Sequence, residues 1–212
     1  MPDPTSLLLF TSAALAILLV PGPAVLFVVA RSLEHGHKGG LISILGITAG
    51  TLFHVAAAAL GVSAILLHSA VLFQAVKLLG AAYLIWLGIQ ALLDSSKPEL
   101  VPAKAGEERS AAVIFRQGLV VNLLNPKTAL FFLAFLPQFV DLGRGHVAGQ
   151  IVFLGLYFVV LAMLSDGLWL ILASGLRHWI RRHPRYLVFQ QRFAGGVYLA
   201  LGTTTAVSGA SK

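Results

Sequence analysis

Long apolar stretches follow one another along almost the whole chain. Six of them can be distinguished, at residues 5–30, 40–66, 70–93, 115–140, 148–175 and 190–210. A helix needs about 20 mostly apolar residues to cross the hydrocarbon core of a bilayer, so each stretch is long enough for one crossing. The pattern therefore predicts an all-α, polytopic membrane helix bundle of about six transmembrane helices.

The boundary between the second and third stretches has to be inferred, because no charged residue marks it. Between Lys38 and Lys77 lie 38 residues without Asp, Glu, Lys or Arg. A single helix of that length, rising about 1.5 Å per residue, would far exceed the bilayer. We therefore place a tight turn at His68-Ser69. The alternative is a five-span chain in which one of these segments is only partly inserted.

Composition extends the prediction from fold to function. Hydrophobic residues make up 58% of the 212 residues and charged residues 11%, whereas soluble domains carry about 25% charged residues. The absence of cysteine excludes disulfides and thiol chemistry. No metal-hydrolase, nucleophile-turn or phosphate-loop motif is present, and no basic, aromatic face suits nucleic acid. We expect a lipid-embedded protein that is not an enzyme, with no cofactor, no metal site and no nucleic-acid partner.

Basic residues indicate the orientation in the membrane. The formal charge is +7, and 11 of the 15 Lys and Arg residues fall in the loop after the first stretch, in the central polar segment, or in the loop before the sixth stretch. Loops rich in Lys and Arg lie on the cytoplasmic side. These three loops are therefore expected in the cytoplasm, with both termini outside.

The polar segment 94–116 is expected to be a linker within one transmembrane domain, residues 1–212. It separates repeat one, 1–93, from repeat two, 117–212. A basic residue followed by Gly, Tyr and Leu occurs at Lys77–Leu84 and again, 115 residues later and at the same spacing, at Arg192–Leu199. Because each repeat has three spans, the second copy would lie inverted, as in many transporters. In so apolar a chain, coincidence is the alternative explanation.

The first stretch contains an interruption at Pro21-Gly22-Pro23. Each proline lacks an N–H and clashes with the preceding turn, so the helix has to kink or unwind there. Carbonyls released by such a break have to be buried in protein or face a water-filled cavity. A cavity lined by helix ends suits a zwitterion, whose carboxylate favours a helix N-terminus. A kink that serves only packing is the alternative.

The fourth stretch contains a second interruption, at Asn125-Pro126-Lys127, with Asn122 one turn earlier. The four residues place two amides, a broken helix and an ammonium near the middle of a span. A lysine at that depth costs about 2.5–3.5 kcal/mol on insertion scales. We predict that both interruptions belong to the substrate site.

Asp166 is the only acidic residue well inside a predicted span. A carboxylate at that depth is typical of a proton or cation site, or of a partner for a buried base. We predict that Asp166 couples transport to protons. A purely structural ion pair with Lys127 is the alternative.

Three residues of the second stretch are interpreted as structural. His54 is expected to hydrogen-bond a neighbouring carbonyl, with proton binding as the alternative. Gly46 and Gly50 form a Gly-x-x-x-Gly step, which lets membrane helices approach closely.

Several motifs, taken together in this order and spacing, resemble those of the LysE/RhtB family of amino acid exporters, and the resemblance covers nearly the whole chain. They are Pro21-Gly22-Pro23 followed by Arg31, Gly80-Ala-Ala-Tyr83-Leu84 with Gly88, Gly118-Leu-Val-Val-Asn122-Leu-Leu-Asn125-Pro126-Lys127, and Phe135-Leu-Pro137-Gln138-Phe139-Val140.

The resemblance implies a secondary active exporter of amino acids or amino acid derivatives, driven by protons in antiport. It also implies location in the bacterial inner membrane and a possible homo-oligomer. It does not fix the substrate. The alternatives are an exporter of a metal ion or other small metabolite, and a membrane scaffold that transports nothing. A metal exporter is disfavoured because the predicted spans contain only one Asp, one His and no Cys as ligands. A scaffold is disfavoured because it does not explain the two helix breaks.

Overall fold

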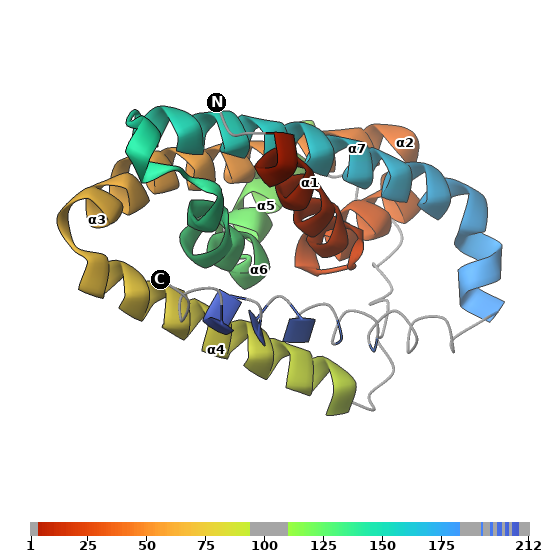
Figure 1. Ribbon diagram of the computed structural model, residues 1–212. Helices are drawn as coiled ribbons and strands as arrows, with labels where there is room; N and C mark the ends of the chain where they lie inside the picture. Colours follow the sequence, from red (N-terminus) through yellow and green to blue (C-terminus); the bar gives the residue numbers. More distant parts are fainter. Residues whose placement is uncertain are drawn as a thin grey trace.

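A computed structural model describes residues 4–93, 110–182, 192, 196, 199–200, 202–203 and 205–207. Within these residues every regular element is helical, and no strand occurs. The predicted all-α fold is confirmed. In Figure 1 the long helix α7 (Val147–Arg182) and the second half of α2 (Pro23–Ala57) run along one edge of the bundle, and α4 (Ala70–Leu93) runs along the opposite edge.

The first apolar stretch is divided, as the prolines predicted. Helix α1 (Pro4–Leu19) ends before Pro21, and α2 begins at Pro23. The residue between the prolines, Gly22, is extended, with φ −124° and ψ −170°. Pro23 stands at the first position of α2, where its missing N–H costs nothing. The chain therefore unwinds here.

Helix α2 is a hairpin of two arms, residues 23–35 and 37–57, joined at Gly36. Gly36 has φ +65° and ψ −162°, a conformation that glycine adopts much more readily than other residues. The arms pack on each other, because Val28 and Ile44 belong to one buried cluster. A Cβ added at Gly40 would lie 2.3 Å from the Ser32 hydroxyl oxygen. The loop between the first two predicted spans is thus reduced to a turn at Gly36.

The second arm continues into a π-helical turn, η1 (Ala58–Val62), and a short helix, α3 (Ser63–His68). Ser69 is extended, with φ −154° and ψ 96°, and α4 begins at Ala70. The turn predicted at His68-Ser69 is confirmed.

The second half of the chain begins with α5 (Ala111–Leu123). The hydroxyl of Ser110 accepts the N–H of Val113 at 3.4 Å and caps this helix. The helix therefore starts inside the segment 94–116 that was expected as a linker. The remaining elements are α6 (Pro126–Leu130), the π-helical η2 (Phe131–Phe135), the 3₁₀ turns η3 (Leu136–Phe139) and η4 (Leu142–Arg144), and α7.

Close contact between α2 and α5 depends on glycine. A Cβ added at Gly46 would lie 2.3 Å from the carbonyl oxygen of Phe115, and one at Gly50 would lie 2.9 Å from Cβ of Asn122. On the other helix, a Cβ at Gly118 would lie 2.9 Å from the Ser43 carbonyl oxygen. The Gly-x-x-x-Gly step therefore serves packing, as predicted.

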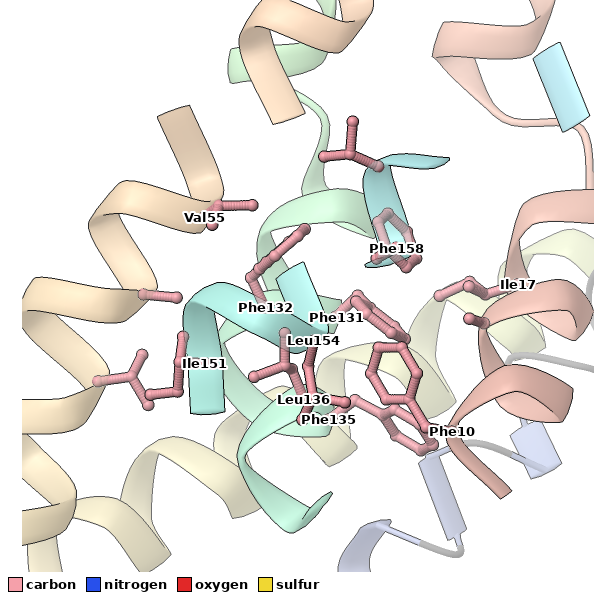
Figure 2. Close-up of a cluster of buried hydrophobic side chains, with 14 of the residues drawn as sticks. Phe10, Ile17, Val55, Phe131, Phe132, Phe135, Leu136, Ile151, Leu154 and Phe158 are labelled. Carbon is pink, nitrogen blue, oxygen red and sulfur yellow. The ribbon is translucent and has the colours of Figure 1, made fainter. Parts of the chain in front are cut away.

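The core lies where α1, η2 and α7 meet. Figure 2 shows Phe10, Phe131 and Phe158 converging from these three elements. The ring of Phe131 stacks on that of Phe158, with 4.3 Å between their centroids. The ring of Phe10 meets Phe131 edge-on at 5.7 Å. The π-helical turn η2 contributes Phe131, Phe132 and Phe135 to this core.

Two of the described helices are long and apolar enough to cross a membrane, residues 23–65 and 147–173. Helix α5 and residues 126–139 form a pair bent by 48°, which counts as a third crossing if the pair is one span. Because residues 23–65 fold back at Gly36, they supply the end of the first predicted span and the whole second. The membrane helix bundle is confirmed, and six separate crossings stay a prediction.

Part of the predicted organisation falls outside the described residues. This applies to residues 94–109 of the linker and to Gly195 and Tyr198 of the recurring motif. Of the sixth apolar stretch, Gly202 packs against α4, since a Cβ there would lie 2.9 Å from the Ala81 carbonyl oxygen. The inverted repeat accordingly stays a prediction.

Candidate functional site

Both helix breaks border one small cavity in the interior of the bundle. Its volume is about 30 Å³, enough for one or two water molecules. Five elements supply its polar surface: the ends of α1 and α2 at the first break, α5 and α6 at the second, and α7 opposite. The lining residues are Ile17, Leu18, Gly22, Ala24, Val25, Ile47, Thr51, Asn122, Asn125, Lys127, Thr128, Phe131, Phe158, Ala162 and Asp166.

The first break releases carbonyls at the end of α1, and two side chains from the second half of the protein bind them. The ammonium of Lys127 donates to the Val20 carbonyl at 2.5 Å. The hydroxyl of Ser165 donates to the Leu18 carbonyl at 3.3 Å. These carbonyls carry the negative end of the α1 dipole, which explains why a cation binds there.

The other side of the first break is the N-terminus of α2. Gly22 has no side chain to cap it, and Ala24 and Val25 of the first turn line the cavity. The first N–H groups of a helix have no partner within the helix. This end therefore offers donors and a positive dipole to an anion.

The second break is organised by Asn125. Its side-chain oxygen accepts the backbone N–H of Lys127 at 3.1 Å and thereby caps α6. Pro126 stands at the first position of that helix. The cap fixes the backbone of Lys127, while its four-carbon side chain extends across the cavity to Val20.

Asn122 is the centre of a buried network of hydrogen bonds between α2 and the second break. Its amide nitrogen donates to the Ile47 carbonyl and to the Thr51 hydroxyl oxygen, both at 2.8 Å. Its side-chain oxygen accepts the Thr128 hydroxyl at 3.1 Å and the Asn125 amide at 3.4 Å. All four bonding positions of this amide are used, and only 1% of the residue is exposed.

His54 binds a carbonyl, as predicted. Its Nε2 lies 3.0 Å from the backbone oxygen of Asn122, and because a carbonyl only accepts, the imidazole donates. The ring also stacks on Phe132, with 6.1 Å between centroids. His54 therefore holds the end of α5 and does not line the cavity.

Asp166 on α7 lies across the cavity from the second break and is 5% exposed. Its carboxylate and the ammonium of Lys127 interact electrostatically, but they are not within the 4.0 Å that defines an ion pair. In this conformation Lys127 contacts the Val20 carbonyl instead. The site thus holds a buried cation and a buried carboxylate that share a cavity without direct contact.

Sequence reasoning found the charged and amide groups of this cavity and missed the rest. Gly22, Asn122, Asn125, Lys127 and Asp166 all line it, whereas the three prolines only form the breaks. The missed residues give no signal in sequence, because single threonines, serines and phenylalanines are common in apolar helices. They are Thr51, Thr128, Phe131 and Phe158 of the cavity, together with Ser165, which binds the Leu18 carbonyl at the first break.

Known proteins similar to this chain are named as membrane or efflux proteins. An uncharacterised membrane protein of Bacillus subtilis, YrhP, is 30% identical over 96% of this chain and 99% of its own length. The homoserine/homoserine lactone efflux protein of Salmonella typhi is 30% identical over 93% of both chains. An uncharacterised membrane protein of Pseudomonas aeruginosa, PA4757, is 34% identical over 91% of this chain and 90% of its own.

No solved structure matches the chain significantly. The family described as LysE type translocator matches residues 15–209. This match spans both helix breaks and the helix that carries Asp166. The chain belongs to the family of LysE type translocators.

Proposed function

We propose that this protein is a secondary active exporter of amino acids or amino acid derivatives, coupled to protons, in the bacterial inner membrane. The single observation that carries the proposal is the joining of both helix breaks at one cavity that also holds a cation and a carboxylate. The relatives named for homoserine and homoserine lactone efflux support the same substrate class.

The groups around the cavity match the two charges of an amino acid. The uncapped N-terminus of α2, at Gly22 and Ala24, offers N–H donors for a carboxylate. The Val20 carbonyl and the carboxylate of Asp166 offer acceptors for an ammonium. A neutral metabolite would leave the charged groups unmatched inside the membrane, and an unpaired buried charge is costly.

In the described conformation the cavity is constricted. A volume of about 30 Å³ is too small for an amino acid. Phe131 and Phe158, stacked at 4.3 Å, form one wall. Phe131 begins the π-helical turn η2, and π-helical turns often occur at functional sites. Loading therefore requires these two rings to separate, and we assign this movement to η2.

Asp166 is the candidate for proton coupling. It is the acidic residue of the cavity, and a carboxylate that faces alternately to each side can take up a proton on one side and release it on the other. Lys127 faces it across the same cavity. The proposal also includes location in the inner membrane and assembly into a homo-oligomer.

Transport by the purified full chain in proteoliposomes tests the proposal. Vesicles are loaded in turn with labelled homoserine, threonine, lysine and leucine, and release is followed with and without an imposed pH gradient. Release of at least one amino acid that accelerates with the gradient and slows when a protonophore collapses it is the expected result. Protein-free vesicles are the control.

The competing functions predict other results. A metal or metabolite exporter would release none of the amino acids but would move divalent cations or another solute. A scaffold would release nothing under any gradient. Either outcome, with correctly inserted protein, would refute the proposal.

A further inference from the structure

We propose that the ammonium of Lys127 is a tethered substitute for the ammonium of the substrate. In the empty carrier the Lys127 ammonium donates a hydrogen bond to the Val20 carbonyl, and the ammonium of a transported amino acid displaces it. This inference rests on the proposed function and adds the role of one residue in its transport cycle.

The contact has the chemistry that a substrate ammonium would use. Lys127 donates through a primary ammonium to a backbone carbonyl at the C-terminal end of α1, at 2.5 Å. An amino acid carries the same group. Val20 is fully buried, and Lys127 is 8% exposed, so the bond is shielded from lipid and from bulk water. Only a ligand that enters the cavity can compete for this carbonyl.

The backbone of Lys127 is fixed, and its side chain can move without disturbing the fold. Its backbone is fixed by the Asn125 cap of α6, and the amide network of Asn122 does not include the ammonium. Only the flexible side chain connects the charge to the helix. Rotation of that side chain therefore leaves the second break intact.

A displaced ammonium also has a place to go. Asp166 lines the same cavity and interacts electrostatically with Lys127, but the two form no ion pair in this state. When the substrate ammonium binds Val20, the Lys127 ammonium moves to the Asp166 carboxylate. The cavity then contains two ammonium groups and two carboxylates, counting the substrate carboxylate at the N-terminus of α2. Lys127 and Asp166 then neutralise each other, and the two substrate charges face the negative end of the α1 dipole and the positive end of the α2 dipole.

This role concerns the empty carrier. Without a ligand and without Lys127, the buried Val20 carbonyl would have no side chain to bind it, and an unsatisfied buried acceptor is unfavourable. Lys127 satisfies it and so stabilises the closed, empty form through which the carrier returns. Exchange of substrate for substrate does not pass through that form. Lys127 is therefore needed for net export and not for exchange.

The test separates these two modes in proteoliposomes. In Lys127→Met, net efflux into substrate-free medium should fall at least tenfold further than exchange of labelled for unlabelled substrate does. Binding should tighten, by about tenfold if the lost Val20 contact contributes about 1.4 kcal/mol against the substrate. Lys38→Met, an exposed lysine beside the Gly36 turn, is the matched control and should change neither mode.

A second variant covers the case in which Lys127→Met does not fold. The chain has no cysteine, so Lys127→Cys provides one reactive thiol in the cavity. Treatment with aminoethyl methanethiosulfonate restores an ammonium and should restore net efflux. Methyl methanethiosulfonate, which adds a neutral group to the same thiol, should not restore net efflux.

The possible failures are distinguishable. A wild-type protein that moves no amino acid would refute the proposed function. Two other results would refute only the inference about Lys127 and leave the proposed function standing. One is normal export by the wild type with loss of exchange in Lys127→Met. The other is equal rescue of Lys127→Cys by the neutral reagent. Either result would show that the lysine binds the substrate directly or only supports the fold.

Discussion

Gly46 lies so close to Phe115 that a Cβ atom on Gly46 would stand 2.3 Å from the Phe115 carbonyl oxygen. The obstacle is backbone in the middle of α5, which cannot rotate away as a side chain can. Gly46→Ala should therefore force α2 and α5 apart and destabilise the protein by about 1–3 kcal/mol, the usual cost of overpacking. Thermal unfolding in detergent measures the effect.

Gly61→Ala is the matched control for that substitution. Gly61 is also helical and belongs to the same span, toward its other end, but a Cβ there meets nothing within 4 Å. The melting temperature of the Gly61→Ala variant should equal or exceed that of the wild type. Equal melting temperatures for both variants would show that α2 and α5 are not packed as described.

Asn122 should be far more sensitive to substitution than its partner Thr51. Asn122→Asp replaces the amide donor by a carboxylate oxygen that faces the Ile47 carbonyl and the Thr51 hydroxyl oxygen. Two donor bonds at 2.8 Å are lost, and buried acceptors stay unsatisfied, each costing about 1–3 kcal/mol. Thr51→Val removes one acceptor and keeps the shape. A melting temperature of Thr51→Val lower than that of Asn122→Asp would contradict the described network of hydrogen bonds around Asn122.

Asp166→Asn tests coupling. The amide keeps the size of the side chain and its hydrogen bonding but cannot titrate. We expect a folded protein that loses accumulation driven by a pH gradient and retains slowed exchange, because the amide oxygen still accepts a displaced Lys127 ammonium. Flux of labelled substrate with and without the gradient measures both. Lys38→Met again serves as control.

A structural role for Asp166 predicts a different result. If its carboxylate only neutralises Lys127, the single change should lower the melting temperature, and the double change with Lys127→Gln should restore gradient-driven export. Recovery of that export in the double variant would refute coupling by Asp166.

Membrane orientation follows from the distribution of basic residues and has a direct test. Single cysteines introduced at Gly106 and Arg182 into this cysteine-free chain should resist an impermeant thiol reagent added to intact cells, because both positions are predicted to be cytoplasmic. Labelling should appear after the membrane is permeabilised. Labelling of either position in intact cells would reverse the topology.

The sequence predicted the breaks and turns of this fold because each depends on local chemistry. Proline at 23 and 126 has no N–H to donate, and a helix that spans both sides of it is unfavourable wherever it lies. The turn at His68-Ser69 followed from the thickness of the bilayer alone. The buried charges were found because a lysine or aspartate inside an apolar stretch is rare.

Contacts between helices could not be predicted in the same way. In a soluble protein the polar side of a helix shows which face is buried. Here apolar residues predominate in both α5 and α7, so the sequence does not show that Asn122 faces Thr51 or that Phe131 meets Phe158. The path of Lys127 to Val20 joins residues 107 positions apart and depends on the same unknown helix rotations.

The glycine turn of α2 has a consequence for assembly. Because the two arms pack symmetrically about Gly36, the partners Ser32 and Gly40 are only eight residues apart in sequence, and Val28 and Ile44 only sixteen. Such local contacts have a low contact order and form early. The hairpin is therefore ready as a folded unit while the ribosome is still far from residue 127. The cavity residues Ala24, Val25, Ile47 and Thr51 are then together before Lys127 has been synthesised.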